Sequence, residues 1–358
     1  MCNGACVNST ATNMNLPAPS VFTRPYALTT GDFNADGNVD VAATSETSGN
    51  LMVFLGKGDG TFPNAIGWAA NQAVGAGIAT ADFNGDGIAD LAVADPAGYV
   101  NVLIATGSEQ FGSDVQYAIG MTAAPVWVIA ADFNRDSKPD LAVANNLTNN
   151  VSILLGKGDG TFPAPVNYAT ASGPQSLVEA DFNGDGKLDL AVAAFNSNKA
   201  SILLGNGDGT FQAAVSYATD ISPSSIVAID LNGDGKTDLA TANSGTTAND
   251  VSVLLGNGNG VFQTAVNYPV GSSPGGVTAG DFNGDGKVDL VAANGGSGSV
   301  SVLHGNGNGT FQSSVNYAAG DAPLGVVAAD FNGDGKTDLM AANSGGNTLS
   351  IFLGNSCF

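Results

Sequence analysis

The stretch DFNGDGKVD, residues 281–289, decides the fold because it recurs along the whole chain. Close variants of the pattern stand at regular steps of 49–51 residues. Self-similarity at such a period is the signature of a repeat architecture, in which each repeat is one supersecondary unit. The motif begins at Asp32, Asp82, Asp132, Asp181, Asp230, Asp281 and Asp330.

Around each motif the sequence reads as four short strands. In the last unit an apolar stretch, 326–331, precedes the motif, and two more, 338–343 and 349–354, follow it. A glycine-rich turn leads into a fourth stretch such as 313–320. Four antiparallel strands per repeat form the blade of a β-propeller, and propellers have about 4–8 blades. We therefore predict an all-β fold, a seven-bladed β-propeller of four-stranded antiparallel blades.

The two ends of the chain favour a closed ring over an open solenoid, whose ends would need polar caps. The last unit stops after its third strand, and segment 16–33 matches segment 266–282, which includes a fourth strand. We expect residues 13–20 to pair onto the last blade, which removes the exposed sheet edges. The expected organisation is an N-terminal extension, residues 1–12, and a single propeller, residues 13–358.

Composition narrows the class of protein. Apolar residues make up 43% of the chain and charged residues 12%, and 50 residues are glycine, which suits short strands and tight turns. The formal charge of −22 argues against a nucleic acid partner, since phosphate binding needs clustered Lys and Arg. No run approaches the ~18 apolar residues of a membrane-spanning helix, so we expect no membrane insertion.

The repeated motif carries the oxygen ligands that calcium prefers. In residues 281–289 the oxygen-bearing side chains stand at positions 1, 3, 5 and 9, which are Asp281, Asn283, Asp285 and Asp289. Ca²⁺ takes 6–8 oxygens, and position 7 of such a loop adds a backbone carbonyl. The alternative is a set of Asp and Asn turns bonded to their own backbone. Seven copies disfavour it, because clustered carboxylates repel one another unless a cation neutralises them.

We expect about seven Ca²⁺ ions, one per blade. The loops hold 21 of the 32 acidic residues, and seven divalent ions would change the charge from −22 to −8. In the third loop Ser137 replaces the glycine, which leaves full occupancy of that loop open. The predicted ligands, with position 7 acting through its carbonyl, are Asp32, Asn34, Asp36, Asn38, Asp40, Asp82, Asn84, Asp86, Ile88, Asp90, Asp132, Asn134, Asp136, Lys138, Asp140, Asp181, Asn183, Asp185, Lys187, Asp189, Asp230, Asn232, Asp234, Lys236, Asp238, Asp281, Asn283, Asp285, Lys287, Asp289, Asp330, Asn332, Asp334, Lys336 and Asp338.

The strings F-x-x-A/S-V-x-Y, D-F-N-G-D-G-x-x-D-L and G-N-G-x-G-T-F resemble FG-GAP (VCBS-type) repeats. Such repeats form the calcium-bearing propeller of integrin α chains, of some fungal lectins and of many bacterial secreted proteins. The resemblance covers about 340 residues. It implies a seven-bladed propeller with calcium in the loops between first and second strands. It also implies extracellular recognition or adhesion, although one fold serves several functions.

The first residues, MCNGACVNSTATNMNLP, lack the basic and apolar regions of a signal peptide. We nevertheless expect a secreted or cell-surface protein whose leader is absent from this sequence. The three cysteines all lie near the termini. The repeat alignment favours a Cys6–Cys357 disulfide, then Cys2–Cys357, then Cys2–Cys6, and a disulfide would fit an oxidising compartment.

Residues for catalysis are scarce, so we predict no catalytic residue. His304 is the only histidine and takes the place of Leu255 in its strand, which indicates a partly buried structural role. Glu179 stands among small residues of the inner strands and is either directed into the central channel or solvated at its mouth. The glycine-rich turns lack the helix and lysine of a phosphate-binding loop.

Aromatic residues outside the repeat pattern are candidates for binding a ligand. Five tyrosines recur in a V-x-Y pattern and Trp68 takes the same place, which indicates packing. Trp127, Tyr26 and Tyr99 fall outside this pattern, in connections that share the face opposite the calcium loops.

Three functions from different classes follow. The first is a recognition or adhesion module for glycan or extracellular protein, because the turns on this face vary while the framework repeats. The second is a structural or filament-forming surface protein that self-associates through its N-terminal extension. The third is a sugar lyase or dehydratase on a propeller scaffold; we predict that the chain is not an enzyme.

Overall fold

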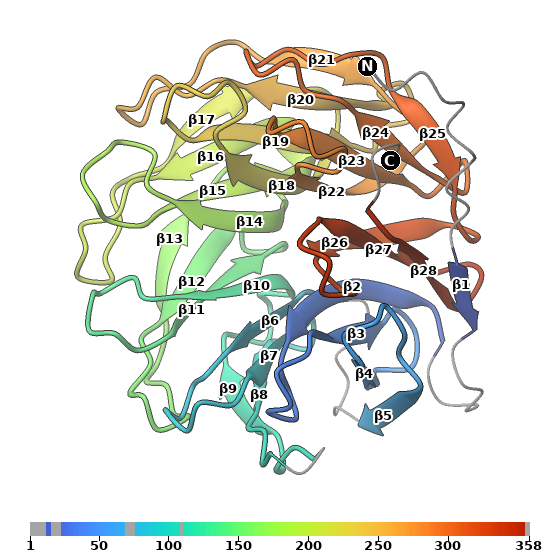
Figure 1. The fold of residues 1–358 in the computed structure, drawn as a ribbon. Coiled ribbons are helices and arrows are strands. Elements are labelled where there is room, and N and C mark those ends of the chain that lie inside the picture. Colours follow the sequence, from blue (N-terminus) through green and yellow to red (C-terminus); the bar gives the residue numbers. More distant parts are fainter. Residues whose placement is uncertain (1–11, 16–22, 69–75, 108–109, 355–358) are drawn as a thin grey trace.

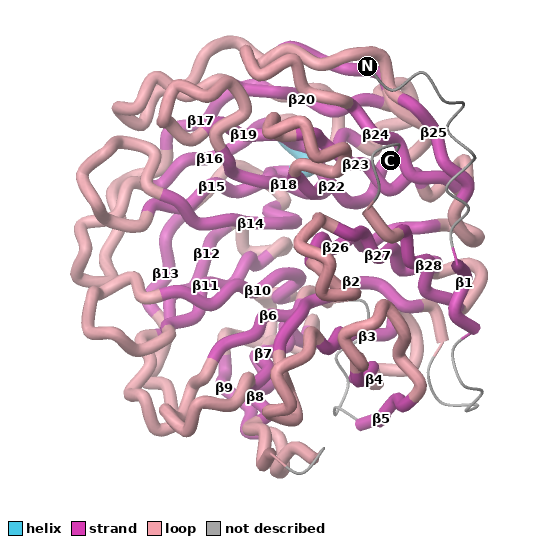
Figure 2. The backbone as a smooth tube through the Cα atoms, in the orientation of Figure 1, coloured by secondary structure: helices cyan, strands magenta, loops and turns pink. Residues whose placement is uncertain are grey.

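The structure is a computed structural model that describes residues 12–15, 23–68, 76–107 and 110–354. These residues form seven four-stranded antiparallel sheets around a central axis (Figures 1 and 2). They contain one short 3-10 helix, η1 (Phe195–Ser197), and no helix with the length and apolar character to cross a membrane. The predicted seven-bladed β-propeller is confirmed.

Each blade runs from an inner strand at the axis to an outer strand at the rim. Blade 1 is β2 (Pro25–Gly31), β3 (Asp40–Ser45), β4 (Leu51–Leu55) and β5 (Asn64–Trp68); blade 2 is β6 (Ile78–Ala81), β7 (Asp90–Asp95), β8 (Tyr99–Leu103) and β9 (Val115–Ala118); blade 3 is β10 (Pro125–Ala131), β11 (Asp140–Asn145), β12 (Asn150–Leu154) and β13 (Val166–Ala169); blade 4 is β14 (Pro174–Ala180), β15 (Asp189–Ala194), β16 (Lys199–Leu203) and β17 (Val215–Ala218). Blade 5 is β18 (Pro223–Ile229), β19 (Asp238–Asn243), β20 (Asp250–Leu254) and β21 (Val266–Pro269); blade 6 is β22 (Pro274–Gly280), β23 (Asp289–Asn294), β24 (Ser299–Leu303) and β25 (Val315–Ala318); blade 7 is β26 (Pro323–Ala329), β27 (Asp338–Asn343), β28 (Thr348–Phe352) and β1 (Thr12–Asn15).

The N-terminal strand closes the ring, as the sequence predicts. β1 pairs antiparallel with β28, with Asn13 opposite Ser350, and so becomes the outer strand of blade 7 (Figure 1). Residues 16–20 of the predicted closing segment lie outside the described residues, as do Cys2, Cys6 and Cys357. The disulfide pairing therefore stays a prediction.

The core lies between the blades. The second strand of every blade, such as β11 and β15, is buried along its whole length, and most of each third strand is buried as well. Both faces of each sheet pack against neighbouring blades, which explains the continuous apolar runs of these strands. The outer strands of blades 2–6 are largely exposed at the rim.

Aromatic side chains join neighbouring blades. Each repeated motif, such as residues 82–90, forms a turn between the first and second strands of its blade that we call an Asp loop. Phe83 at position 2 of this loop and Tyr117 of the same blade both pack edge-on against Phe162 of the next blade, with ring centroids 5.6 and 5.2 Å apart. Trp68 packs in the same way against Phe111, at 4.9 Å. Edge-to-face pairs of this kind are favoured by the ring quadrupoles. The interpretation of the periodic tyrosines and Trp68 as packing residues is confirmed.

The two ends of the central channel differ in chemistry. Every inner strand ends at an Asp loop, and the glycine-rich turn after each third strand lies at that same end. The turns hydrogen-bond across blades; Gly160 N, for example, donates to Phe83 O at 2.8 Å. The turns between second and third strands, and the connections between blades, lie at the opposite end, which we call the channel mouth.

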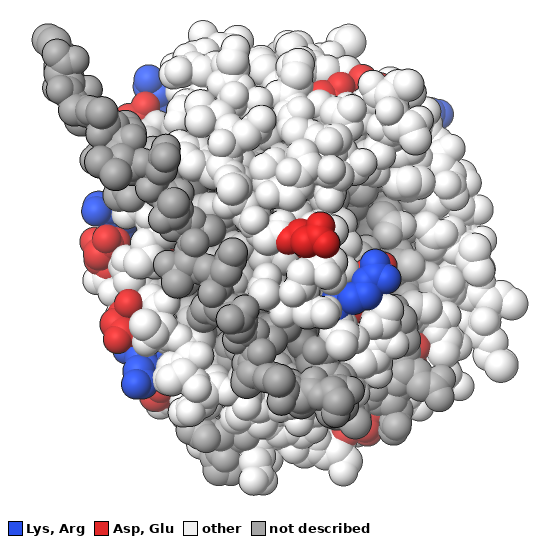
Figure 3. Space-filling view, turned by 90° about the vertical axis from the view of Figure 1, so that its right-hand side faces the viewer, with Lys and Arg blue, Asp and Glu red and all other residues white. Residues whose placement is uncertain are grey.

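A salt bridge and a hydrogen bond lie at the interface between blades 1 and 7, at the channel-mouth end of the ring. Arg24 Nη2 lies 2.9 Å from Glu46 Oε2, and that oxygen accepts a hydrogen bond from Ser344 Oγ at 2.7 Å. Exposed pairs of this kind contribute little to stability, about 0–1 kcal/mol. On the side of the ring shown in Figure 3, charged side chains form small separate groups on a largely uncharged surface.

Candidate metal loops and ligand pocket

Each Asp loop curls around its own side-chain oxygens. In the sixth loop, Asp281 Oδ1 accepts the N–H of Gly284 and Asp285, and Asp281 Oδ2 accepts that of Gly286 at 2.8 Å. Gly286 has a φ of 79°, a conformation that glycine adopts without strain. In the third loop Ser137 holds the same place with a φ of 64°, and its N–H still donates to Asp132. The serine therefore leaves the loop shape unchanged.

The aspartate at position 9 has a structural role that the sequence did not reveal. In blade 4, Asp189 is fully buried, and its two oxygens accept the N–H of Phe182 at 2.9 Å and of Gly205 at 2.7 Å. This carboxylate thus ties the start of the loop to the end of the third strand. The equivalent residues of the described loops make the same two contacts; they are Asp40, Asp90, Asp140, Asp238, Asp289 and Asp338.

Burial makes the charged form of these carboxylates costly. It raises the pKa to about 6 in the first four loops, with a smaller contribution from the carboxylates at positions 1 and 5 of the same loop; these residues are Asp40, Asp90, Asp140 and Asp189. At position 7, a lysine lies 3.1–3.9 Å from the position-5 carboxylate in the loops that contain Lys138, Lys187, Lys236, Lys287 and Lys336. One lysine balances only one of three carboxylates.

As the side chains stand, no three Asp, Glu, His or Cys side chains among the described residues converge closely enough to hold a metal ion. The hydrogen bonds give the reason, since positions 1, 5 and 9 each face amide N–H groups. The donor set still fits a hard cation such as Ca²⁺, because it offers three carboxylates, one amide and a carbonyl. A carboxylate has about four lone-pair sites, so the two N–H bonds at position 9 leave lone pairs for a cation, whereas Asp281 at position 1 already accepts three N–H bonds.

His304 lies beside the sixth Asp loop. Its Nδ1 is 3.4 Å from Asp289 Oδ2 and 3.1 Å from Asn283 Nδ2, and its side chain is 20% exposed. The contact with Asp289 raises the pKa of the imidazole. The partly buried setting agrees with the sequence interpretation, but the contact with the loop had no sequence signal, since 15 residues separate His304 from Asp289.

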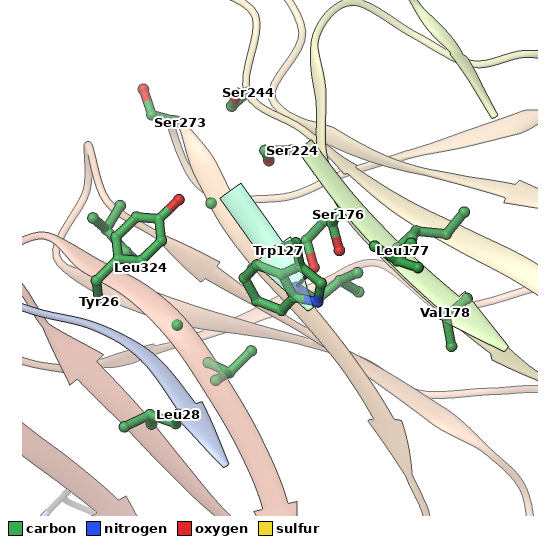
Figure 4. A pocket seen from close by; sticks show the side chains of 17 residues that line it. Tyr26, Leu28, Trp127, Ser176, Leu177, Val178, Ser224, Ser244, Ser273 and Leu324 are labelled. Atoms are coloured by element: carbon green, nitrogen blue, oxygen red, sulfur yellow. Dashed lines mark hydrogen bonds between the residues drawn. The ribbon is translucent and has the colours of Figure 1, made fainter. Parts of the chain in front are cut away.

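A cavity of about 350 Å³ lies at the channel mouth (Figure 4). It is lined by residues from the inner strands of blades 1 and 3–7, together with Ser244 and Ser273. No described residue of blade 2 borders the cavity; Gly77, just before β6, donates its N–H to Val126 O at 2.8 Å and lies against the Trp127 side chain. Gly276 and Gly325 bring neighbouring inner strands close together, since an added Cβ would overlap the backbone of the next strand.

Two of the three predicted ligand-face aromatics line this cavity. Trp127 and Tyr26 both border it, whereas Tyr99 begins β8 and lies outside the lining. Burial raises the pKa of the Tyr26 phenol. The sequence missed five serines of the lining, because their positions within the repeat vary; they are Ser176, Ser224, Ser225, Ser244 and Ser273.

Glu179 stands one residue beyond Val178, which lines the cavity, towards the Asp-loop end of β14. It is partly buried, and this burial raises the pKa of its carboxyl. Glu179 is outside the lining itself.

A separate, more open hollow lies at the rim between blades 3 and 4, where Tyr168, Lys199, Phe211 and Gln212 meet.

Solved structures similar to this chain share its fold at low sequence identity. The BP39L lectin from Burkholderia pseudomallei is 18% identical, with a TM-score of 0.68 over 92% of this chain and 95% of that chain. BBS1N, solved in complex with ARL6DN, is 12% identical, with a TM-score of 0.65 over 96% and 97%. Virginiamycin B lyase from Staphylococcus aureus is 13% identical, with a TM-score of 0.65 over 96% and 99%. No curated protein matches the chain.

The repeats themselves match a known family. The FG-GAP-like repeat matches six overlapping segments, which are residues 32–93, 82–143, 133–192, 181–241, 230–292 and 281–341. Together these segments extend from the first Asp loop to the second strand of the last blade. The chain belongs to the FG-GAP-like repeat family.

Proposed function

We propose that this chain is a secreted, calcium-stabilised recognition protein that binds glycan or extracellular protein at the channel mouth. The cavity bordered by Trp127 and Tyr26 carries the proposal. Its volume lies within the range of small-molecule sites, about 300–1,000 Å³, and aromatic walls with a few polar groups are typical of such sites.

We include calcium in the proposal because the side-chain and backbone oxygens of the Asp loops are the kind of ligand that this ion prefers. In each loop the side chains at positions 1, 3 and 5, the carbonyl at position 7 and the free lone pairs of position 9 would hold the ion. When bound, the ion supplies positive charge that offsets three carboxylates. The loops would then act as rigid supports for the inner strands, whose other ends form the cavity.

The lining of the cavity supports binding rather than catalysis. It contains no carboxylate, histidine or lysine, the groups that most often act as general acids and bases, and the Tyr26 phenol is its one titratable side chain. Similar solved structures include a lectin, a protein bound to a partner protein and a lyase. These proteins share only the fold with this chain, so they do not decide between a binding protein and an enzyme. The choice between the two therefore rests on the residues that line the cavity.

Replacing Trp127 with Ala is expected to weaken binding at least tenfold. Truncating a central aromatic anchor typically costs about 2 kcal/mol or more, and 1.4 kcal/mol is a tenfold change in affinity. A glycan array and a panel of purified extracellular matrix proteins would be probed with the wild type and with this variant. Met121→Ala is the matched control, because Met121 is 86% exposed in the connection between β9 and β10, at the same end of the ring.

Melting curves of both variants check that the fold persists. Equal binding by Trp127→Ala and the wild type would contradict recognition at the channel mouth. Loss of binding by both variants would point to another surface of this end.

A further inference from the structure

The cavity at the channel mouth contains no charged side chain. Its lining consists of Tyr26, Trp127, serines, glycines and aliphatic residues. An anionic ligand would meet no Lys or Arg in the lining and the field of a chain with charge −22. A cationic ligand would meet no carboxylate in the lining. The lining thus offers no ionic partner to a charged ligand of either sign, which favours a neutral one.

The lining has a rim that carries serine hydroxyls together with Leu324, and a floor that is apolar. In Figure 4 the hydroxyls of Ser224, Ser244 and Ser273 lie on one side of Trp127, and Leu28 and Val178 lie on the other. Chain position gives the same order. Ser224 is the second residue of its inner strand, whereas Leu28 and Val178 are the fourth and fifth of theirs, nearer to the Asp loops. The ligand must accordingly have one polar and one apolar part.

The rim both donates and accepts hydrogen bonds. Ser225 Oγ accepts the N–H of Val277 at 3.2 Å, which leaves its proton for a ligand. Ser224 Oγ shares its single proton between the carbonyls of Ala242 and Pro274, which leaves its lone pairs for a ligand. The Tyr26 phenol, which has Gln175 as a hydrogen-bonding neighbour, also has a proton to donate. Groups that donate and accept at once, such as sugar hydroxyls, match this rim.

Two aromatic rings stand beside these hydroxyls. Aromatic faces bury apolar C–H surface while a neighbouring polar group is hydrogen-bonded. A sugar ring combines both kinds of surface in one rigid unit. A purely apolar ligand would leave the remaining hydrogen-bonding capacity of the serine and tyrosine hydroxyls unused, at a cost in free energy.

From these contacts we infer that the channel-mouth cavity binds one neutral sugar ring that carries a methyl-bearing substituent. The sugar hydroxyls meet the serine rim, the ring lies against the aromatic side chains, and the methyl group of an N-acetyl or 6-deoxy substituent enters the floor of Leu28, Val178, Val277 and Val326. A cavity of about 350 Å³ suits one ring with its substituents. This inference rests on the proposed recognition function and names its ligand class.

Titration calorimetry and ligand-observed NMR with five small probes test the assignment. The probes are the methyl glycosides of N-acetylglucosamine, fucose, glucose and glucuronic acid, and choline. The N-acetyl or 6-deoxy sugar is expected to bind at least threefold more tightly than the glucoside, and the glucuronide at least tenfold more weakly than the glucoside. Tightest binding of the glucuronide or of choline would overturn the inference.

Variants locate the site. Tyr26→Phe and Trp127→Phe keep an aromatic ring, and each is expected to weaken binding of the preferred sugar at least threefold, with Trp127→Ala weaker still. Tyr168→Phe, in the hollow at the rim between blades 3 and 4, is the matched control and is expected to bind as the wild type does. If Tyr168→Phe alone weakens binding, glycan recognition stands but the channel-mouth assignment is wrong. If no probe and no array glycan binds the wild type, the sugar inference is wrong; binding of a matrix protein that Trp127→Ala abolishes would then preserve the broader proposal.

Discussion

Removing calcium with excess EDTA is expected to lower the melting temperature of this protein by more than about 10 °C. An ion that binds the folded state alone stabilises it by about 2.7 kcal/mol per site when its concentration is 100 times Kd. Seven loops of the same donor composition add their contributions, because each loop lies in a different blade. Differential scanning calorimetry with and without the chelator measures the shift.

The control for this experiment is EDTA already saturated with calcium, which should leave the melting curve unchanged. Metal content is measured on the same samples. Coincident curves for the metal-free and calcium-loaded protein would contradict the role of the loops as stabilising metal sites.

Replacing Asp189 with Ala is expected to lower the free energy of unfolding by about 2–6 kcal/mol, even in EDTA. The substitution leaves two N–H groups, those of Phe182 and Gly205, without their acceptor inside the fold. Each orphaned donor costs about 1–3 kcal/mol. Urea unfolding monitored by fluorescence gives the difference, and Asp189→Asn, which keeps one acceptor oxygen, should fall between this variant and the wild type.

Asp185→Ala in the same loop is the matched comparison. Asp185 lies at the surface and is paired with Lys187 at 3.1 Å, so its loss should cost less than about 1 kcal/mol in EDTA. In calcium the same variant should lose one ion while the ring persists. Equal stability of Asp189→Ala and Asp185→Ala in EDTA would show that the contacts of position 9 do not support the fold.

The architecture could be predicted because the sequence contains seven copies of the motif, and each copy supports the same interpretation. The spacing of the Asp motifs gives the number of blades, and the match of residues 16–33 to 266–282 gives closure by an N-terminal strand. Tyr117 and Trp68 were identified as packing residues by their periodic positions alone, and their edge-on contacts with Phe162 and Phe111 agree.

The site could be predicted only where residues depart from the repeat. Trp127 and Tyr26 stand out in this way and border the cavity, whereas the serines beside them are common residues at varying positions. The role of Asp289 was not accessible from the sequence either, since its partner Gly305 lies 16 residues further on, at the end of another strand. Contacts of that kind depend on how strands pair, which residue spacing within one loop does not contain.

Native mass spectrometry of the full chain, titrated with calcium after EDTA treatment, tests the central claim about the Asp loops most directly. Seven loops with the same donor set predict a final state with about seven bound Ca²⁺ ions, and Asp185→Ala should bind one fewer. A spectrum that shows no calcium bound at millimolar concentration would contradict the account, and the Asp loops would then be hydrogen-bonded turns alone.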